Sequence, residues 1–157
     1  MTTPTPTNAL ARRWKIDIDM SDDKDGSDYQ NIIGITEFTQ SAEPNIEDSS
    51  DYDSEGWAGN TKTGQAWEVG LTINRRINDQ VKTYHPTHEK LRFAGYAYGS
   101  DSEVRVRWYD RDGLPEAYEG IAVVQWAPSG GEATALDQVE VTLTGNGVLS
   151  LIDNPVA

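Results

Sequence analysis

The chain has 157 residues, which suits a single domain with a buried core and requires no second domain. Its 26 acidic residues outnumber its 13 basic ones, and the formal net charge of −13 argues against tight, direct binding to nucleic acid or anionic lipid. The lack of cysteine excludes disulfides and thiolate metal sites, and because no stretch reads as a signal peptide or a membrane span, we expect a soluble protein of the cytoplasm.

The N-terminal residues 1–13 predict a flexible arm, because alternating threonine and proline favour extended, solvated backbone. A period of two follows in WKIDIDM, residues 14–20, and predicts a half-buried strand. Its expected inner face consists of Trp14, Ile16, Ile18 and Met20, and its outer face of Lys15, Asp17 and Asp19. The apolar run NIIGITEF, residues 31–38, predicts a second strand after an acidic turn.

Residues 39–63 show no period and are rich in Ser, Asp, Glu, Asn and Gly, so they predict a long loop. A loop of this length in a small domain is usually functional or mobile. It contains EDSSDYDSEGW, residues 47–57, which holds five acids and no base and ends in Trp57. Alternation returns at WEVGLTINR, residues 67–75, and predicts a third strand.

One helix is predicted at about 87–98, with Pro86 and Thr87 at its start and Gly99 at its end. Its small apolar face would consist of Leu91, Ala94, Gly95 and Tyr98. Strands are predicted at 103–109, 118–126 and 138–144, and a mobile tail at 146–157. About six strands and one helix predict a mainly β fold, either a β-sandwich or a strongly curled sheet with a flanking α-helix.

No motif indicates a metal, a cofactor or an enzyme. The EF-hand pattern fails because its first ligand would be Ser21 in one acidic turn and Trp108 in another. His85 and His88, followed by Glu89, have the spacing of a partial metal site, but no further ligand is signalled. Phosphate-binding loops and hydrolase elbows are absent from the sequence, so we expect a protein without catalytic activity.

The aromatic content leaves a second function open. Five tryptophans and seven tyrosines would allow a carbohydrate-binding β-sandwich with a sugar-stacking platform. Trp14, Trp67 and Trp108 lie in register with aliphatic residues, however, and are expected in the core, whereas only Trp57 stands outside a period. A platform requires at least two exposed tryptophans on one face.

Several segments recur in this order in one known family: GITEF, EDSSDYDSEGWAGNTKTGQAW, YHPTHEKLR, VRWYDRDGLPEAYEGIAVVQWAPSGGE and LDQVEVTLTGNG. From about Arg12 to Pro155, the chain resembles the major tail protein, or tail-tube subunit, of long-tailed non-contractile bacteriophages, especially those of actinobacteria. It departs from the family in YHPTHE, where Tyr-Asp-Pro is expected, which affects only a role for His85. Some relatives carry a C-terminal immunoglobulin-like domain, and none is expected here because the sequence stops at Ala157.

The resemblance implies a β-sandwich of two crossed sheets with one flanking α-helix, a fold shared with contractile tail tubes and the type VI secretion tube. It implies a structural virion protein that forms stacked hexameric rings around a tape-measure protein. The other implied partners are the tail terminator and distal tail proteins, while DNA passes through the channel without specific binding. The implied location is the virion tail, after assembly in the host cytoplasm, with no membrane partner.

The resemblance also suggests roles for particular residues. In the family the long loop reaches from one ring to the next, and we assign this role to residues 43–63. Tyr52 and Trp57 would bury against the neighbouring ring, while Asp51, Asp53 and Glu55 would meet bases there. The candidate bases are Arg75, Arg76, Arg105 and Arg107.

Polar residues on two alternating strands are the candidates for the channel wall. They lie near residues 64–74 and 136–145, opposite an expected buried face. The candidates are Glu68, Thr72, Gln138 and Glu140. A negative wall would offer the DNA backbone no attractive sites, and six chains would bring six times −13, or −78, formal charges to each ring.

Overall fold

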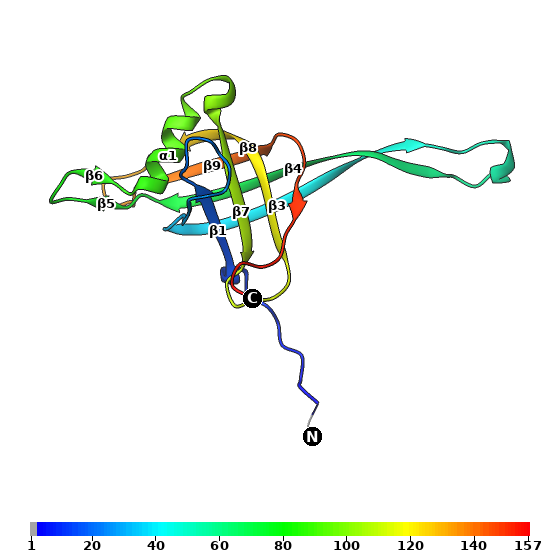
Figure 1. Ribbon diagram of the computed structural model, residues 1–157, viewed down its shortest axis with the longest axis horizontal. Coiled ribbons are helices and arrows are strands. Elements are labelled where there is room, and N and C mark those ends of the chain that lie inside the picture. Colours follow the sequence, from blue (N-terminus) through cyan, green and yellow to red (C-terminus); the bar gives the residue numbers. More distant parts are fainter. Residues whose placement is uncertain (1–2) are drawn as a thin grey trace.

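The computed structural model describes residues 3–157, in which antiparallel strands form one sheet that curls into two crossed layers (Figure 1). One layer contains β2 (Tyr29–Asn31), β1 (Trp14–Asp19) and β7 (Glu103–Asp110). The other contains β9 (Gln138–Gly145), β4 (Asn60–Asn74) and β3 (Ile35–Asp48). The strands at the two ends of the sheet are β2 and β3.

The strand β8 (Ala117–Pro128) belongs to both layers. Residues 117–123 pair with β7, and residues 122–128 pair with β9 on the opposite edge. The short strand β10 (Ser150–Leu151) pairs with Tyr118 and Glu119 of β8 beside the end of β9. The predicted mainly β sandwich with crossed layers and one flanking helix is therefore confirmed, and its two layers are halves of one continuous sheet.

The space between the layers is filled by side chains at alternate positions of the long strands, as the period of two predicts. Trp67 and Trp108 contact each other in this core with ring centroids 5.6 Å apart and ring planes inclined by 42°. Gly120 and Gly145 lie against the Trp67 ring, where a Cβ atom would collide with the indole. The fully buried aliphatic residues of this core include Ile18, Val69, Ile73, Leu91, Val104, Val106, Val139 and Leu143.

Both faces of β1 are covered, contrary to the prediction of a half-buried strand. Asp17 is buried, and hydrogen bonds that it accepts from Arg107 Nε at 3.1 Å and the Tyr109 hydroxyl at 3.0 Å compensate for the lost water. Burial, together with Asp17, raises the pKa of Tyr109 to about 12. Asp19 accepts the backbone N–H groups of Ser21, Gly26 and Asp28, which hold the turn after β1. Alternation in the sequence cannot distinguish such paired carboxylates from solvated ones.

Residues 31–38 are not one strand, because the chain breaks between β2 and β3 at Gly34, which has a φ of +80°. The loop predicted at 39–63 is also wrong as secondary structure. Residues 39–48 continue β3 and residues 60–63 begin β4, and the two strands pair from Ile35/Ile73 to Asp48/Asn60. This pairing forms a long hairpin that projects from the sandwich (Figure 1).

The helix α1 (Pro86–Gly95) begins where predicted but ends earlier, so Leu91 and Ala94 face the core while Tyr98 is 91% exposed. His88 belongs to this helix, and its side chain is fully buried. Its Nδ1 accepts the N–H of Arg76 at 3.3 Å, and its Nε2 donates to the carbonyl of Ile33 at 2.8 Å. Burial lowers the pKa of His88, so the neutral ring fastens the helix to two separate loops.

The N-terminal segment from residue 3 and the C-terminus lie on the same side of the molecule (Figure 1). Residues 3–10 are extended and exposed, as predicted for the arm, whose residues 1 and 2 lie outside the described residues. A short 3₁₀-helix (Ala11–Arg13) follows, and Arg13 forms an ion pair of 2.9 Å with Asp110 that lowers the pKa of this carboxyl to about 2. Among residues 3–157, no helix has the length and apolar character needed to cross a membrane.

The C-terminal tail, which was predicted to be mobile, contacts the body of the protein at two places. Besides β10, the buried Asn154 side chain donates to the carbonyls of Asp110 at 2.8 Å and Leu114 at 2.6 Å. These bonds satisfy the turn between β7 and β8, so the tail attaches there through polar contacts.

We expect His88→Ala to lower the free energy of unfolding by about 1–3 kcal/mol, because two buried backbone groups lose their partners. The neutral form stabilises the fold fully above the ordinary pKa of about 6.5, and this contribution is lost as pH falls toward the lowered pKa of the folded state. Urea unfolding of the parent should therefore show decreasing stability from about pH 7 to 5.

The variant His88→Ala should show a smaller decrease over the same range, whereas His85→Asn, which keeps a side chain able to cap α1, should behave like the parent. An unchanged pH dependence in His88→Ala would assign the effect to another group.

Candidate assembly surfaces

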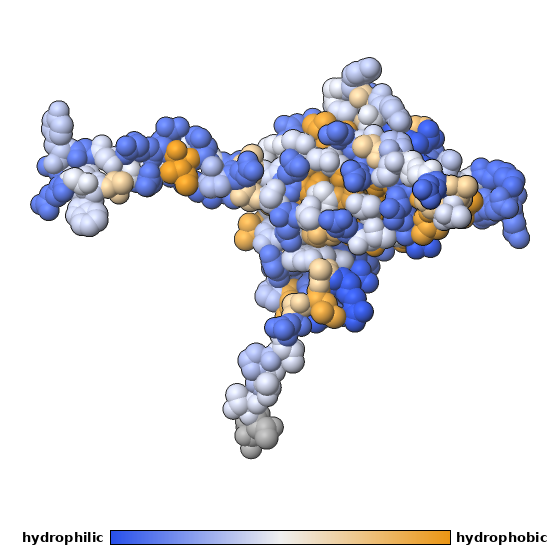
Figure 2. Space-filling model, turned by 180° about the vertical axis from the view of Figure 1, so that it is seen from behind, coloured by the Kyte–Doolittle hydropathy of each residue, from blue (hydrophilic) through white to orange (hydrophobic). Residues whose placement is uncertain are grey.

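The outer part of the β3–β4 hairpin, residues 43–63, is here called the hairpin arm. The strand β9 pairs with β4 only over residues 68–74, so the strands of the arm pair only with each other. Every residue of the arm except Ser54 and Gly59 is exposed. The arm forms a thin, mainly hydrophilic projection in Figure 2, and an isolated ribbon of this kind gains little from its own burial.

Hydrogen bonds order the tip of the hairpin arm. The Asp51 carboxylate accepts from the N–H of Asp53 at 3.0 Å and from the Ser54 hydroxyl at 3.1 Å, which caps the 3₁₀-helix Tyr52–Ser54. The chain then turns through Glu55, whose φ is +53°. This turn leaves the Trp57 side chain 80% exposed and Tyr52 fully exposed.

The tip therefore combines large aromatic side chains with a strong negative charge. Residues 43–57 contain six acids and no base. Hydrogen bonds from Ser50 lower the pKa of Asp48, which favours its charged form. Exposed tryptophan is uncommon on a monomer surface, so the tip is a candidate contact surface.

Three of the four bases proposed as partners for the acids are already engaged within the chain. Arg107 bonds Asp17, and Arg105 forms an ion pair with Glu119. Arg75 lies 3.9 Å from the Tyr84 ring centroid and pairs with Glu89 at 3.5 Å. Arg76 is exposed and forms no ion pair within residues 3–157, which leaves it as the available candidate.

The proposed channel-wall residues share the outward face of one layer. Thr72 pairs directly with Glu140, and Gln138 Nε2 donates to Asn74 Oδ1 at 2.8 Å. Glu68 and Glu140 are exposed, while Thr72 and Gln138 are half-buried. The neighbouring outward positions on β3, β4 and β9 are Glu37, Thr39, Ser41, Gly70, Thr142 and Thr144. This face thus carries acids and hydroxyl groups and no base.

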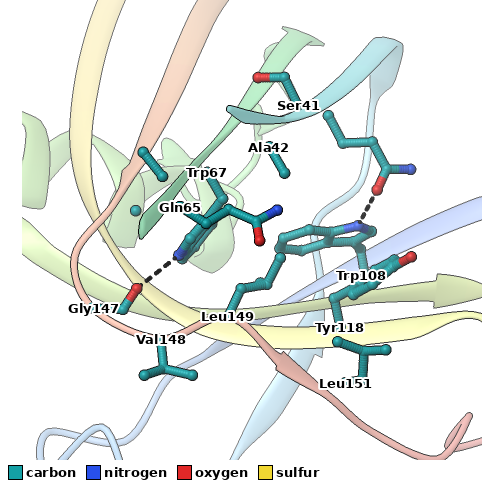
Figure 3. A pocket seen from close by; sticks show the side chains of 13 residues that line it. Ser41, Ala42, Gln65, Trp67, Trp108, Tyr118, Gly147, Val148, Leu149 and Leu151 are labelled. Carbon is teal, nitrogen blue, oxygen red and sulfur yellow. Dashed lines mark hydrogen bonds between the residues drawn. The ribbon is translucent and has the colours of Figure 1, made fainter. Parts of the chain in front are cut away.

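A groove of about 790 Å³ lies between the base of the hairpin and residues 145–151 (Figure 3). The indole of Trp108 donates to Gln40 Oε1 at 2.9 Å, and that of Trp67 donates to the Gly147 carbonyl at 3.2 Å. Both indole N–H groups are therefore already bonded. The remaining lining is largely apolar and includes Leu151, which is 80% exposed, so the groove favours an apolar contact over an oriented polar substrate.

The other candidate chemistry finds little support in the geometry. Within residues 3–157, no three His, Asp or Glu side chains gather as a metal site would require. His85 caps α1, and His88 bonds backbone groups as described. Trp57 is the exposed tryptophan, Trp14 is half-buried against the core, and Trp67, Trp108 and Trp126 are buried, so the described residues offer no pair of exposed tryptophans for a sugar platform.

A second projection was missed by the sequence analysis. Residues 75–85, here called the β5–β6 arm, contain β5 (Ile77–Asn78) paired with β6 (Thr83–Tyr84). Two-residue strands are too short to produce a period. The signal available in the sequence was the presence of the apolar residues Ile77 and Val81 in the otherwise polar segment 76–82, and both are exposed in the structure.

Comparison with known proteins identifies the fold. No protein-family model and no curated protein matches the sequence. A chain from the tail of an empty gene transfer agent (GTA) particle, refined helically with C6 symmetry, aligns with a TM-score of 0.70 at 14% identity, covering 92% of this chain and 99% of that chain. The SPP1 tail tube aligns with a TM-score of 0.65 at 13% identity, covering 94% and 80%.

A chain of an extracellular contractile injection system, the PVC sheath–tube complex in its extended state, aligns with a TM-score of 0.60 at 10% identity, covering 92% of this chain and 93% of that chain. At these identities the likeness establishes the fold. The tail-tube fold implied by the sequence resemblance is therefore confirmed.

We expect Trp57→Ala to change the free energy of unfolding of the isolated chain by no more than about 0.5 kcal/mol, because the exposed indole contributes little to the core. The matched change Trp67→Ala removes a buried indole and should cost about 3–5 kcal/mol. Urea unfolding followed by circular dichroism compares the two variants. A large loss of stability in Trp57→Ala would show that this residue supports the monomer fold.

Proposed function

We propose that this protein is a tail-tube subunit, a structural protein of the type found in phages of actinobacteria. The observation that carries the proposal is the match of nearly the whole chain to tail and tube structures in fold. The ordered sequence segments from Arg12 to Pro155 support the actinobacteriophage type. The structural matches described above come from tail or tube assemblies, which favours a non-enzymatic role.

In this proposal six copies close into a ring by pairing at their sheet edges. The edges of the sheet are β2 and β3, and an unpaired edge strand offers a row of backbone donors and acceptors to another chain. Closure removes such edges. The C6 symmetry of the GTA tail supports the number six.

The outward face of β3, β4 and β9 would then line the channel. Glu68 and Glu140 would give the wall negative charge, and Thr72 and Gln138 would add polar groups without charge. This face carries no arginine or lysine that could bind DNA phosphates. The wall would therefore repel the DNA along its whole length and bind it nowhere. A tape-measure protein would occupy the channel before DNA passes, and terminator and distal tail proteins would bind the two ends of the tube.

The hairpin arm would connect one ring to the next. Trp57 and Tyr52 would bury against the neighbouring ring, while Asp51, Asp53 and Glu55 would approach its bases. Burial of one large side chain contributes about 2–3 kcal/mol, which ordering of the arm partly offsets. Each contact would be weak alone, but six arms acting together would hold two rings.

Concentrated protein should form hollow tubes in negative-stain electron micrographs, and Trp57→Ala should abolish them while leaving the monomer folded. The expected reason is loss of the buried indole at each ring junction. Sedimentation of both proteins at the same concentration quantifies the difference. Discrete particles without tubes in the parent protein, at every salt concentration tested, would count against the proposed function.

The channel wall can be mapped by thiol labelling, because the chain has no cysteine of its own. In assembled tubes, Glu140→Cys should react with a polymer-linked maleimide at least about tenfold more slowly than in free subunits, since the polymer cannot enter the channel freely. The same substitution labelled with a small maleimide provides the control. Equal rates for the polymer reagent in tubes and subunits would place Glu140 outside the channel.

A further inference from the structure

The end of the molecule opposite the hairpin arm carries a surface of opposite character. In Figure 1 the β5–β6 arm and α1 lie at one end of the long axis and the hairpin arm projects at the other. The chain as a whole has a charge of −13, but residues 75–92 contain five bases and two acids, a formal charge of +3. The strongly acidic arm and this basic segment are thus separated by the body of the molecule.

Not all of these bases are available to a partner. Arg75 and Arg92 both contact Glu89, at 3.5 and 2.6 Å, and Lys82 pairs with Asp79. Arg76 and Lys90 form no ion pair within residues 3–157. Arg76 is exposed and Lys90 is half-buried. A base without a partner in a chain this acidic is a candidate for pairing with another copy.

Exposed apolar side chains lie on the same two elements as the two available bases. Ile77 and Val81 on the β5–β6 arm are 65% and 63% exposed, and Phe93 on α1 is 61% exposed. Lys90 and Phe93 are three residues apart on the helix and therefore share a face. We name the set Arg76, Ile77, Val81, Tyr84, Lys90 and Phe93 the receiving surface.

The receiving surface is held in place before any contact forms. His88 accepts the N–H of Arg76, and the carbonyl of Arg76 accepts the N–H of His85, which fixes the base of the β5–β6 arm against α1. The guanidinium of Arg75 stacks between the rings of Tyr84 and Trp126, at 3.9 and 5.1 Å from their centroids. A surface ordered in advance loses less conformational entropy on binding.

We propose that the receiving surface of one copy binds the hairpin arm of a second copy. Asp51 and Asp53 would meet Arg76 and Lys90, and Trp57 would pack among the exposed apolar residues. The two surfaces lie at opposite ends of one molecule, so the contact joins different copies head to tail and can continue without limit. The inference rests on the proposed function, because it names the partner of the arm within the tube.

A charge exchange between two full-length variants tests this pairing. Variant A carries Asp51→Lys and Asp53→Lys, and variant B carries Arg76→Glu and Lys90→Glu. Each alone brings like charges together and should need at least about tenfold more protein to assemble, a factor equal to 1.4 kcal/mol. When A and B are mixed in equal amounts, the basic arm of A meets the acidic surface of B, and the acidic arm of B meets the basic surface of A. The two variants should therefore assemble and sediment together at nearly the protein concentration that the parent needs.

A matched control is Arg12→Glu with Lys15→Glu, which reverses two bases that also lie outside the ion pairs of residues 3–157. It should not restore assembly of variant A. Thermal unfolding by circular dichroism verifies that each variant is folded. The proposal is overturned if A assembles alone like the parent, if A and B fail to co-sediment although the parent assembles, or if the control restores A as well as B does.

Disulfide trapping separates this contact from the proposed function. A chain with Ala58→Cys and Val81→Cys, which keeps Trp57, should give a ladder of intermolecular cross-links in concentrated protein, and Ala58→Cys with Lys15→Cys should give at least about tenfold less of it. A ladder without tubes in the parent supports the contact and argues against a tail-tube role. Tubes without a ladder leave the tail-tube role intact and overturn the contact.

Discussion

The position of every candidate surface depends on the strand β8, which hydrogen-bonds to β7 along one edge and to both β10 and β9 along the other. A flat strand cannot serve neighbours that run in crossed directions, so β8 must bend and carry the sheet from one layer to the other. The bend encloses Trp67 and Trp108, and it leaves room for the Trp67 ring because Gly120 and Gly145 lack side chains. With the layers crossed, β3 and β4 leave the sandwich on one side while α1 and the β5–β6 arm occupy the other.

Charge is distributed so that the fold is internally paired while its projections are not. Within the sandwich, carboxylates such as Asp17 and Asp19 are bonded by arginine, tyrosine or backbone N–H groups, and they stabilise the subunit regardless of its neighbours. Where acids of the hairpin arm form hydrogen bonds, most of their partners are nearby Ser side chains and backbone N–H groups. Repulsion between such exposed acids weakens with salt over a Debye length of about 10 Å at 0.1 M. In the proposed assembly, the same acids would both keep free subunits apart and attract a basic partner.

The sequence predicted those parts of the fold in which one face is buried. Val104 and Val106 on β7, or Val139 and Val141 on β9, alternate with polar residues because a core lies on one side only. The hairpin arm has no core on either side, so its strands carry no period and read as a loop. Hydrogen bonds to single side chains, such as those of Asn154 and His88, were equally unpredictable, because they depend on loops that meet only in the folded chain. The exposed Trp57 was predictable because it stands outside every period.

The two-stranded construction of the hairpin arm restricts how its length can change. Side chains alternate between its faces, and a bulge already shifts the register where Asn45 pairs with Gly64 and Ile46 with Lys62. Insertion of one residue in each strand would turn the tip over and point Trp57 the opposite way, whereas insertion of two would restore the facing and lengthen the arm by about 7 Å. Among chains that share this architecture, reach should therefore vary in discrete steps, and subunits whose arms differ by an odd number of residue pairs should be incompatible in a mixed assembly.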